Sequence, residues 1–464
     1  MIPERLEGLV AATADLAVRF AAAGKNLYLV GGVVRDAIVN RLGDTEDLDF
    51  TTDALPEETE RILAGWADAL WTQGKRFGTI GAKKAGRDYE ITTHRAEAYH
   101  PDSRKPDVRF ATEVEADLAR RDFTVNAMAL KLPCQPDEAV EVIDPFDGLL
   151  DLAAGRLRTP LSPEESFSDD PLRMLRAARF IAGYQLVPDD ALVAAVKEMA
   201  PRLAIVSAER VRDEFNKLLV LPDPSAGLWF VVQTGLADQF VPELRALSVE
   251  QDPIHRHKDV LAHAIAVVNN TGPDLVLRMA ALLHDVGKPA TRQFSDKGVS
   301  FHHHEVVGAR MARKRLSALR WPTDDLDDVV KLVELHLRFH TYSMGWTDSA
   351  IRRYVRDAGP MLDRLNQLTR ADCTTRNEAK AKRLSDRMDT LEREIERLRT
   401  QEELDAIRPD LDGVQVMEHL GISPSRAVGD ALHFLLELRL EHGPLGEEEA
   451  YRRLDAWWAS RESV

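Results

Sequence analysis

Residues 27–36 read LYLVGGVVRD and predict a short apolar strand that runs through two glycines into a helix. Gly31 and Gly32 would let the backbone approach a ligand closely, and the N–H groups at the start of the helix suit a phosphate. A Gly-Gly pair between a strand and a helix is by itself usually only a turn. The stretch therefore predicts a mixed α/β domain, and its neighbours in the chain must decide whether it also binds phosphate.

A pair of acidic residues follows this helix, in the sequence DLDF at 47–50. On a strand, residues i and i+2 face the same side, so the carboxylates of Asp47 and Asp49 would lie together. Such a pair repels unless a cation lies between, and it suits Mg²⁺, which also contacts substrate phosphates. Two metals there would activate a hydroxyl nucleophile and stabilise a leaving pyrophosphate. The alternative is an acidic strand end that is simply exposed to water.

The pattern of the chain changes near residue 151. Apolar residues at helical spacing predict a helix over 5–22. β-rich segments lie near 79–82, 88–94, 107–112, 125–131 and 139–143. Beyond 151, stretches rich in Leu, Ala and Arg dominate and strand signals vanish. We therefore expect an α+β fold class, with a mixed α/β head and a largely all-α remainder, divided into the domains 1–150, 151–250, 251–375 and 376–464.

A long helix is predicted over 378–400, with apolar residues spaced like the seam of a heptad repeat. The seam residues are Leu384, Met388, Leu391, Ile395 and Leu398. Packing of this helix on its own chain is the favoured interpretation. Dimerisation and an RNA-facing arm are the alternatives.

Three further motifs follow the acidic pair in order. Residues 120–129 read RRDFTVNAMA, residues 143–148 read IDPFDG, and residues 169–180 read DDPLRMLRAARF. Together with the Gly-Gly-x-x-Arg-Asp and Asp-x-Asp motifs, they resemble the bacterial class II tRNA nucleotidyltransferase and poly(A) polymerase family, whose head belongs to the polymerase β-like nucleotidyltransferases. The resemblance covers about residues 27–220. The family has Glu where this chain has Asp169.

The resemblance implies a role for each motif. Asp47 and Asp49 would carry catalysis with Mg²⁺. Asp170 and Arg173 would act as a protein template that reads the base edge of incoming CTP or ATP. An i, i+3 pair shares one helix face, and Arg offers fixed donors where Asp offers acceptors.

Further contacts with the nucleotide are implied for a larger set of residues. Arg176 and Arg179 would extend the template face with charge that suits a triphosphate, and Glu90 is a possible extra acid near the site. The resemblance also implies nucleotide binding by Gly31, Gly32, Arg35, Asp36, Arg121, Asp122 and Asn126.

Histidines concentrate between residues 255 and 340, and His284-Asp285 lies in an apolar helix. Burial of an unpaired charge there would be costly, whereas imidazoles and carboxylates together bind divalent metals. The order H…HD…D resembles the HD superfamily of metal-dependent phosphohydrolases. It implies the ligands His263, His284, Asp285 and Asp372. The sequence FHHHEVVGA at 301–309 resembles a stretch of many HD domains, which makes His304 and His336 candidates for a second metal. The alternatives are structural histidines, or an HD fold that serves as scaffold.

Composition limits the partners. The chain has 61 Lys and Arg against 77 Asp and Glu, a net charge of −16, so its average surface does not favour polyanions and RNA binding requires a local basic patch. Cys134 and Cys373 lie too far apart in the sequence to suggest a disulfide framework, and a reducing cytoplasm is expected. Charges interrupt the apolar pattern of the N-terminus, so no signal peptide is expected. No uncharged apolar stretch predicts a membrane helix.

We therefore expect template-independent addition of C, C and A to the 3′ end of tRNA, from CTP and ATP, with release of pyrophosphate. Mg²⁺ is expected at the head, and Mg²⁺ or a divalent transition metal at the HD site, whose phosphohydrolase activity stays open. The expected partners are tRNA, CTP and ATP, without membrane or DNA, and the oligomeric state is open. The alternatives are a poly(A) polymerase of the same family, addition of only part of the tail, and a metal-dependent phosphohydrolase with a nucleotide-binding head.

Overall fold

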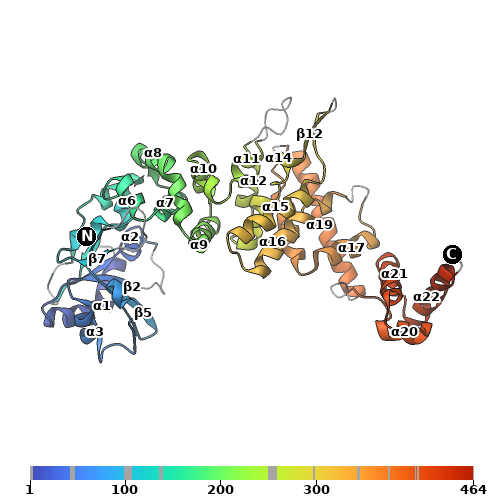
Figure 1. Cartoon of the computed structure of the whole chain (residues 1–464), viewed down its shortest axis with the longest axis horizontal. Coiled ribbons are helices and arrows are strands. Elements are labelled where there is room, and N and C mark those ends of the chain that lie inside the picture. Colours follow the sequence, from blue (N-terminus) through green and yellow to red (C-terminus); the bar gives the residue numbers. More distant parts are fainter. Residues whose placement is uncertain are drawn as a thin grey trace. The chain divides into compact units, whose positions relative to one another are not determined.

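The computed structural model describes residues 4–41, 48–98, 107–134, 138, 140–248, 259–295, 298–341, 345–374, 377–402, 404 and 407–462. Asp47 lies outside these ranges, so only the second acid of the Asp-x-Asp pair is placed. The chain forms two compact units, Met1–Pro242 and Glu243–Val464 (Figure 1). The predicted α+β class is confirmed, while the four-domain division stays a prediction.

The first unit contains a seven-stranded mixed sheet in the order β3-β4-β5-β2-β1-β8-β9. Its strands are β1 (Leu27–Val30), β2 (Leu48–Thr52), β3 (Ala69–Trp71), β4 (Thr79–Lys84), β5 (Arg87–Thr93), β8 (Ala129–Lys131) and β9 (Glu141–Ile143). Strands β2 and β5 are parallel, and the other neighbours are antiparallel. The shorter strands β6 (Arg95–Ala98) and β7 (Asp107–Phe110) form a separate pair.

Helices α1 (Glu4–Ala22) and α2 (Gly32–Ile38) bury their apolar residues on this sheet. Phe20, Leu29, Phe50 and Ile91 are at most 1% exposed within one core. The other helices of the head are α3 (Pro56–Leu63), α4 (Val114–Ala119) and α5 (Gly148–Ala154).

The segment 125–131, expected to be β-rich throughout, is divided. Residues Thr124–Asn126 form a 3-10 turn, and only Ala129–Lys131 is strand. The IDPFDG motif fits against this turn. The Asp144 carboxylate accepts the backbone N–H groups of Gly148 and Leu149, and a Cβ on Gly148 would lie 2.3 Å from the Thr124 carbonyl oxygen. This close approach requires glycine and ties α5 to the turn.

A helical part completes the first unit. Its helices are α6 (Pro163–Asp169), α7 (Leu172–Tyr184), α8 (Asp190–Met199), α9 (Ala208–Leu219) and α10 (Ser225–Gln233). Helix α7 packs against α9 and α10, and its apolar residues are buried. A parallel bridge joins β10 (Arg156–Leu157) to β11 (Val187–Pro188).

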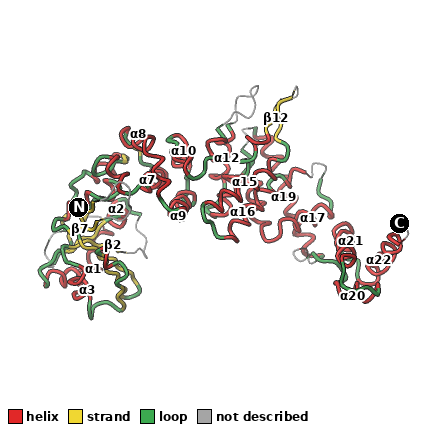
Figure 2. The backbone as a smooth tube through the Cα atoms, in the orientation of Figure 1, coloured by secondary structure: helices red, strands yellow, loops and turns green. Residues whose placement is uncertain are grey.

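The second unit is mainly helical (Figure 2). Its helices are α11 (Glu243–Ala246), α12 (Val260–Asn270), α13 (Leu275–Leu283), α14 (Lys288–Thr291), α15 (His304–Ala318), α16 (Thr323–Leu335), α17 (Asp348–Ala358), α18 (Leu362–Ala371), α19 (Glu378–Gln401), α20 (Gly413–Leu420), α21 (Arg426–His442) and α22 (Glu447–Glu462). The expectation that strands vanish after 151 is wrong, because β12 (Arg292–Ser295) and β13 (Gly298–Phe301) form an antiparallel hairpin. Four residues are too few for a period-2 pattern to stand out among helices.

Helix α19 packs on α17 and α18 of its own chain, which confirms the favoured interpretation of the heptad-like seam. Met388, Leu391, Ile395 and Leu398 are at most 3% exposed. Leu384, the first residue of the seam, is only partly buried. None of the described helices is both long and apolar enough to cross a membrane.

Candidate functional site

The Gly-Gly turn lies beside the second acid of the Asp-x-Asp motif. Gly31 has φ +77°, which L side chains rarely adopt, and a Cβ there would lie 3.1 Å from Arg121 Nη1 and 3.9 Å from Asp49 Oδ2. Both its backbone conformation and this close approach require glycine. The turn therefore brings the backbone before α2 close to a carboxylate and a guanidinium that the sequence predicts to be functional.

The parallel pairing of β2 with β5 sets Asp49 opposite Glu90. Paired residues on neighbouring strands point to the same face of a sheet, and both side chains are exposed. The two acids thus form a carboxylate pair from strands far apart in the chain. Carboxylate oxygens are the ligands that Mg²⁺ prefers, so this pair fits the expected ion.

Asp49 and Glu90 border a polar pocket of about 410 Å³ in the first unit. Its other charged lining residues are Arg95, Arg120, Arg121, Asp122, Asp170, Arg173, Arg176 and Arg210. The pocket brings together seven residues that the sequence analysis named, namely Asp49, Glu90, Arg121, Asp122, Asp170, Arg173 and Arg176. A cavity with acids on one strand pair and arginines around them suits a metal-bound polyphosphate.

Arg35, Asp36 and Asn126 do not line this pocket but form a hydrogen-bond network with one another. The Arg35 side chain is 6% exposed and donates to both Asp36 carboxylate oxygens, to Asn126 Oδ1 and to the Tyr184 hydroxyl. The Tyr184 hydroxyl donates to Asp36 at 2.8 Å. The network joins α2 and the 124–126 turn to α7. Direct nucleotide contact by these three residues stays a prediction.

Asp122 holds Arg176 at the edge of the pocket. Its Oδ2 accepts hydrogen bonds from Arg176 Nε and Nη2 at 2.8 and 2.6 Å, and its Oδ1 accepts from Asn126 at 2.9 Å. Burial alone would raise the pKa of Asp122, but the charge of Arg176 and these hydrogen bonds lower it to about 2. The Asp122 carboxylate is therefore ionised near neutral pH and orients Arg176.

The lowered pKa of Asp122 predicts an acid-sensitive first unit. Its folded pKa lies below the ordinary aspartate value, so its stabilisation is present above about pH 4 and is lost as pH falls toward 2. Hydrogen exchange of β1 and β2 amides should show the first unit weakening over this range. Between pH 4 and 2, the free energy of unfolding of the first unit should fall less in Asp122→Asn than in the unchanged protein, by on the order of 2 kcal/mol. Asp213→Asn changes an exposed acid and should leave this loss of unfolding free energy unchanged. An equal loss in both variants would contradict the assignment of the acid sensitivity to Asp122.

Asp117 holds two arginines that line the pocket, and the sequence interpretation missed it. It is fully buried and accepts hydrogen bonds from Arg120 at 2.8 Å and Arg121 at 3.2 Å. Burial would raise the pKa of Asp117, but these two guanidinium groups lower it to about 2. An acid placed i, i+3 and i, i+4 before two arginines on a helix is a visible pattern that could have revealed this role.

Asp170 and Arg173 both line the pocket, and each is held by other groups. Asp170 Oδ2 accepts from Arg210 Nη2 at 2.7 Å, while Arg173 donates to the Arg120 carbonyl at 2.5 Å and to Ser166 Oγ at 3.0 Å. Arg210, on α9, is a second residue that the sequence interpretation missed, because its partner Asp170 is distant in the chain. Asp170 is an extended residue between α6 and α7, so the expected helix face shared by Asp170 and Arg173 is wrong.

Arg179 lies differently from the expectation. Its Nε donates to the buried carboxylate of Glu214 on α9, and its side chain does not line the pocket. A direct contact with the triphosphate is therefore not supported for Arg179. Its described contact instead joins α7 to α9.

All six residues predicted as HD-type ligands meet in the second unit. They come from α12, the end of α13, the start of α15, the end of α16 and the end of α18. Two groups have ligand atoms within 4.8 Å of one another: His263 with His284 and Asp285, and Asp285 with His304 and His336. Asp372 Oδ1 lies 2.9 Å from His263 Nε2 and so joins the first group.

Asp285 is shared by the two groups. Its Oδ2 lies 3.2 Å from His284 Nε2, and its Oδ1 lies 3.3 Å from His304 Nε2. Lys288 Nζ also lies 2.6 Å from Oδ2. A carboxylate with one oxygen toward each group has the arrangement of a ligand that bridges two ions.

Backbone carbonyl groups orient three of the histidines as metal ligation needs. The Nδ1–H groups of His284, His304 and His336 donate to the carbonyl oxygens of Ala281, Phe301 and Val333 at 2.6–2.8 Å. The Nε2 atoms of these three histidines therefore face inward. The Nε2 atom of His284 lies 3.2 Å from that of His263, and the Nε2 atoms of His304 and His336 lie 3.3 Å apart. Backbone acceptors on the outer nitrogen are the usual support of a ligating imidazole.

The electrostatics of the cluster also fit cations. Burial and the neighbouring His284 lower the pKa of His336 to about 3, which keeps its imidazole neutral. Burial would also lower the pKa of His284, but Asp285 and Asp372 raise it to about 9. A proton therefore balances the buried carboxylates when no metal does, and metal binding would release it. The donor set of imidazoles and carboxylates fits divalent metals.

The fold and the two sites define a nucleotidyltransferase head joined to a helical HD unit. Residues 27–158 match the poly A polymerase head domain, 187–247 match the probable RNA and SrmB-binding site of polymerase A, and 259–377 match the HD domain. The A-adding tRNA nucleotidyltransferase of Deinococcus radiodurans is 34% identical over 444 residues, which cover 93% of this chain and 95% of that enzyme. The chain therefore belongs to the tRNA nucleotidyltransferase and poly(A) polymerase family.

Other relatives match more locally. The CCA-adding enzyme of Limosilactobacillus reuteri is 41% identical over 223 residues, which are 48% of this chain and about half (52%) of that relative's length. The crystal structure of the Bacillus stearothermophilus CCA-adding enzyme in complex with CTP has a TM-score of 0.68 at 23% identity, covering 97% of this chain and 98% of that chain. This likeness confirms the fold over both units.

Proposed function

We propose that this protein adds C, C and A to the 3′ end of tRNA, using CTP and ATP and releasing pyrophosphate. One observation carries the proposal: the acids Asp49 and Glu90 border the same pocket as the pair Asp170 and Arg173. The groups that we propose to bind metal and to read the base thus line one cavity. The local match to a CCA-adding enzyme supports this choice of nucleotides.

Each group has a proposed task. Asp47 and Asp49 would hold Mg²⁺, which when bound lowers the pKa of the RNA 3′-hydroxyl and neutralises the leaving pyrophosphate. Arg121 and Arg176 would hold the triphosphate through charge-assisted hydrogen bonds. The 3′-oxygen then bonds to the α-phosphorus as the bond to the bridging oxygen breaks, so positioning and charge neutralisation supply most of the acceleration.

Addition of the terminal A alone is the second candidate. It is favoured by the match over 93% of this chain to an A-adding tRNA nucleotidyltransferase. The test supplies Mg²⁺ with tRNA that lacks CCA, or that ends in CC, together with CTP, ATP or both, and sequences the product ends. CC followed by one A supports the proposal, and A on the CC-ended tRNA alone supports the second candidate. A long A-run indicates a poly(A) polymerase, and no extension overturns both candidates.

Arg173→Ala should blur the choice between CTP and ATP. Loss of its donors removes half of the base-reading pair, which is worth about 1–3 kcal/mol, or roughly 5- to 150-fold in selectivity. The measurement is the ratio of kcat/KM for the correct and the incorrect nucleotide at each step. Arg212→Ala, which changes an arginine on α9 that does not line the pocket, serves as control. Unchanged selectivity in Arg173→Ala would remove this residue from the template.

We further propose phosphoester hydrolysis at the HD centre, carried by the position of Asp285 between two ligand groups. Mg²⁺ or a divalent transition metal would occupy it and supply a metal-activated water.

The helical parts would hold tRNA by shape and phosphate contacts, so binding should weaken with salt. We place the protein in the cytoplasm, where the free thiols of Cys134 and Cys373 stay reduced.

A further inference from the structure

Two exposed phenylalanine rings lie beside the pocket of the first unit. Phe77 ends the 3-10 turn Lys75–Phe77 and is 40% exposed, and Phe110 ends β7 and is 43% exposed. Burial of a phenylalanine ring is strongly favourable, so two rings left in water at one place need an explanation. Single exposed apolar side chains are ordinary, whereas a group of them indicates a contact surface.

Gly78 brings the two rings together. It follows Phe77 directly and has φ +87°, the left-handed region that favours glycine. A Cβ on Gly78 would lie 3.0 Å from Phe110 Cε1, so the Phe110 ring lies against the backbone of this turn. Arg95 pairs with Phe110 between β6 and β7, and its Nη1 donates to the Phe77 carbonyl oxygen at 2.8 Å. We call Phe77 and Phe110 the aromatic platform.

The platform adjoins the pocket that contains the proposed metal-binding acids. Arg95 lines that pocket, and so does Thr79, which follows the glycine of the turn. The carbonyl oxygen of this glycine accepts the N–H of Thr93 at 2.9 Å, and Thr93 lies three residues from Glu90 along β5. Three residues of a strand span about 10 Å. The platform therefore lies about the length of one nucleotide from the Glu90 carboxylate.

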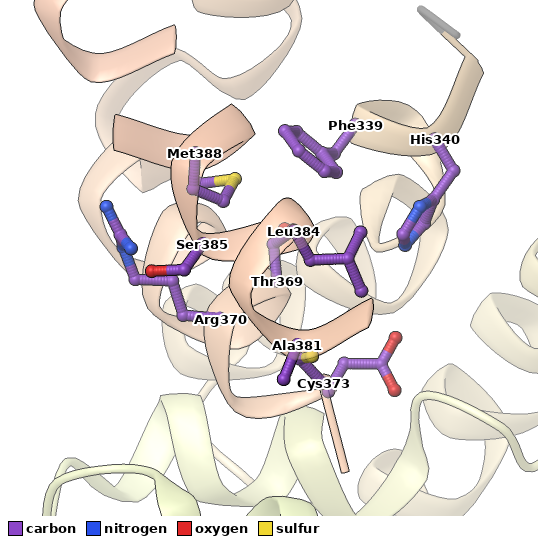
Figure 3. Close-up of a pocket in the computed structure, with 10 residues that line it drawn as sticks. Phe339, His340, Thr369, Arg370, Cys373, Ala381, Leu384, Ser385 and Met388 are labelled. Carbon is purple, nitrogen blue, oxygen red and sulfur yellow. The ribbon is translucent and has the colours of Figure 1, made fainter. Parts of the chain in front are cut away.

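An arginine covers one face of the Phe77 ring. The guanidinium carbon of Arg76 lies 4.5 Å from the centre of this ring, and Arg76 is exposed. In the second unit, Arg387 lies over Phe339 at 4.9 Å, but Phe339 is only 1% exposed and lines the pocket shown in Figure 3. The Phe77 ring, by contrast, offers accessible surface to another flat group, with positive charge beside it. Aromatic rings with arginines beside them are the components of a site for single-stranded nucleic acid.

The chemistry of the platform favours the 3′ end of RNA over other ligands. An apolar ligand would leave the arginines unused, and a free phosphate would leave the rings unused. The base of the incoming nucleotide has its own proposed partners, Asp170 and Arg173. Every nucleobase has a flat face, so stacking accepts any base, whereas hydrogen bonds select one. The terminal base of a growing RNA end changes with each addition, so that end requires a site that tolerates every base.

We propose that Phe77 and Phe110 stack against the 3′-terminal base of the RNA to which nucleotides are added, while Arg76 and Arg95 hold the phosphate that precedes this base. The proposal rests on the proposed nucleotide addition and names the site of its acceptor. Because the platform accepts each terminal base in turn, it places the 3′-hydroxyl beside the metal-binding acids at every step. Both phenylalanines bind the acceptor and take no part in the exchange of bonds.

The first test measures binding without nucleotides and so does not depend on turnover. The Kd of the full-length protein is measured for two tRNAs that differ only in whether the last nucleotide carries a base. In the unchanged protein, loss of the base should weaken binding about 5- to 150-fold, the range for one stacked base. In Phe77→Ala and in Phe110→Ala this base dependence should shrink to within about one third of that factor or less, while the Kd of the tRNA without the terminal base stays within twofold.

Phe294→Ala is the matched control. Phe294 is 67% exposed and lies 4.7 Å from the guanidinium carbon of Arg292, but it belongs to the second unit. This variant should keep the full base dependence, and so should Phe77→Trp, which retains a flat ring. A misfolded variant would lose affinity for both tRNAs. Equal loss toward both tRNAs, or full base dependence in both alanine variants of the platform, would overturn the proposal.

Kinetics separates the platform from the proposed function. In Phe77→Ala, KM for tRNA should rise by the same factor as Kd, while KM for CTP and for ATP stays within twofold. A rise in KM for the nucleotides alone would place the incoming base on the platform and overturn this proposal. Base-dependent binding that requires Phe77, without any extension of tRNA, would support the platform and overturn nucleotide addition. Extension with binding that ignores the terminal base would do the reverse.

Discussion

Asp49→Asn is expected to lower the rate of nucleotide addition at least about 10³-fold, which corresponds to roughly 4 kcal/mol of lost metal-dependent stabilisation. The change keeps the shape of the side chain but removes a charged ligand from the strand that borders the Gly31 turn. Single-turnover extension of tRNA with saturating nucleotide and Mg²⁺ measures the chemical step. Hydrolysis at the HD centre should be unaffected, because its ligands all lie in the second unit.

Two variants on β5 sharpen this test. Asp88→Asn changes another acid of β5, whose carboxylate lies 3.4 Å from Lys83 Nζ and which does not line the pocket. The rate of nucleotide addition in this variant should stay within about twofold. Glu90→Gln changes the acid opposite Asp49 and should cost about 10- to 100-fold, the range for groups that support a metal ligand. Full activity in Asp49→Asn would overturn the assignment of the head.

Asp285→Ala is expected to remove both metal ions and to lower phosphoester hydrolysis at least about 10³-fold. One carboxylate oxygen faces each ligand group, so loss of this side chain weakens both groups at once. His336→Ala should remove one ion only, because it belongs to a single group. Metal content per chain, measured by mass spectrometry after gel filtration, distinguishes these results.

His302→Ala is the matched control for the metal centre. This histidine is exposed, lies in the same segment as His304 and belongs to neither ligand group. It should keep both ions and full hydrolysis. Nucleotide addition, which we assign to the first unit, should persist in all three variants and so excludes global unfolding. Retention of both ions by Asp285→Ala would contradict the bridging role.

The local features of both sites could be predicted from the sequence. Helical spacing predicted 5–22 and strand composition predicted 27–30, and the structure has α1 and β1 there. The i, i+3 spacing of Asp170 and Arg173 predicted a shared helix face, which is wrong because Asp170 is extended and lies before α7, although both residues line one pocket. The predictions of α1 and β1 succeed because backbone periodicity relates residues only a few positions apart.

Several residues gained their meaning only from contacts between distant segments. Glu90 lies opposite Asp49 because β2 pairs with β5 in parallel, and Arg210 reaches Asp170 because α9 packs on α7. Arg179 was expected in the triphosphate site, yet its partner is Glu214. Periodicity along one element does not indicate which acid on another element a long side chain will meet.

The sequence by itself determined the chemistry of this protein: the order of its motifs, the kinds of metal ligands and the class of enzyme. Only the tertiary structure decided which of these groups share a cavity, that Asp285 stands between two ligand groups, and that Phe77 and Phe110 meet at one turn beside the pocket of the head. The physical reason is that residue type and spacing constrain local conformation, whereas strand pairing and helix packing follow from burying apolar surface across the whole unit.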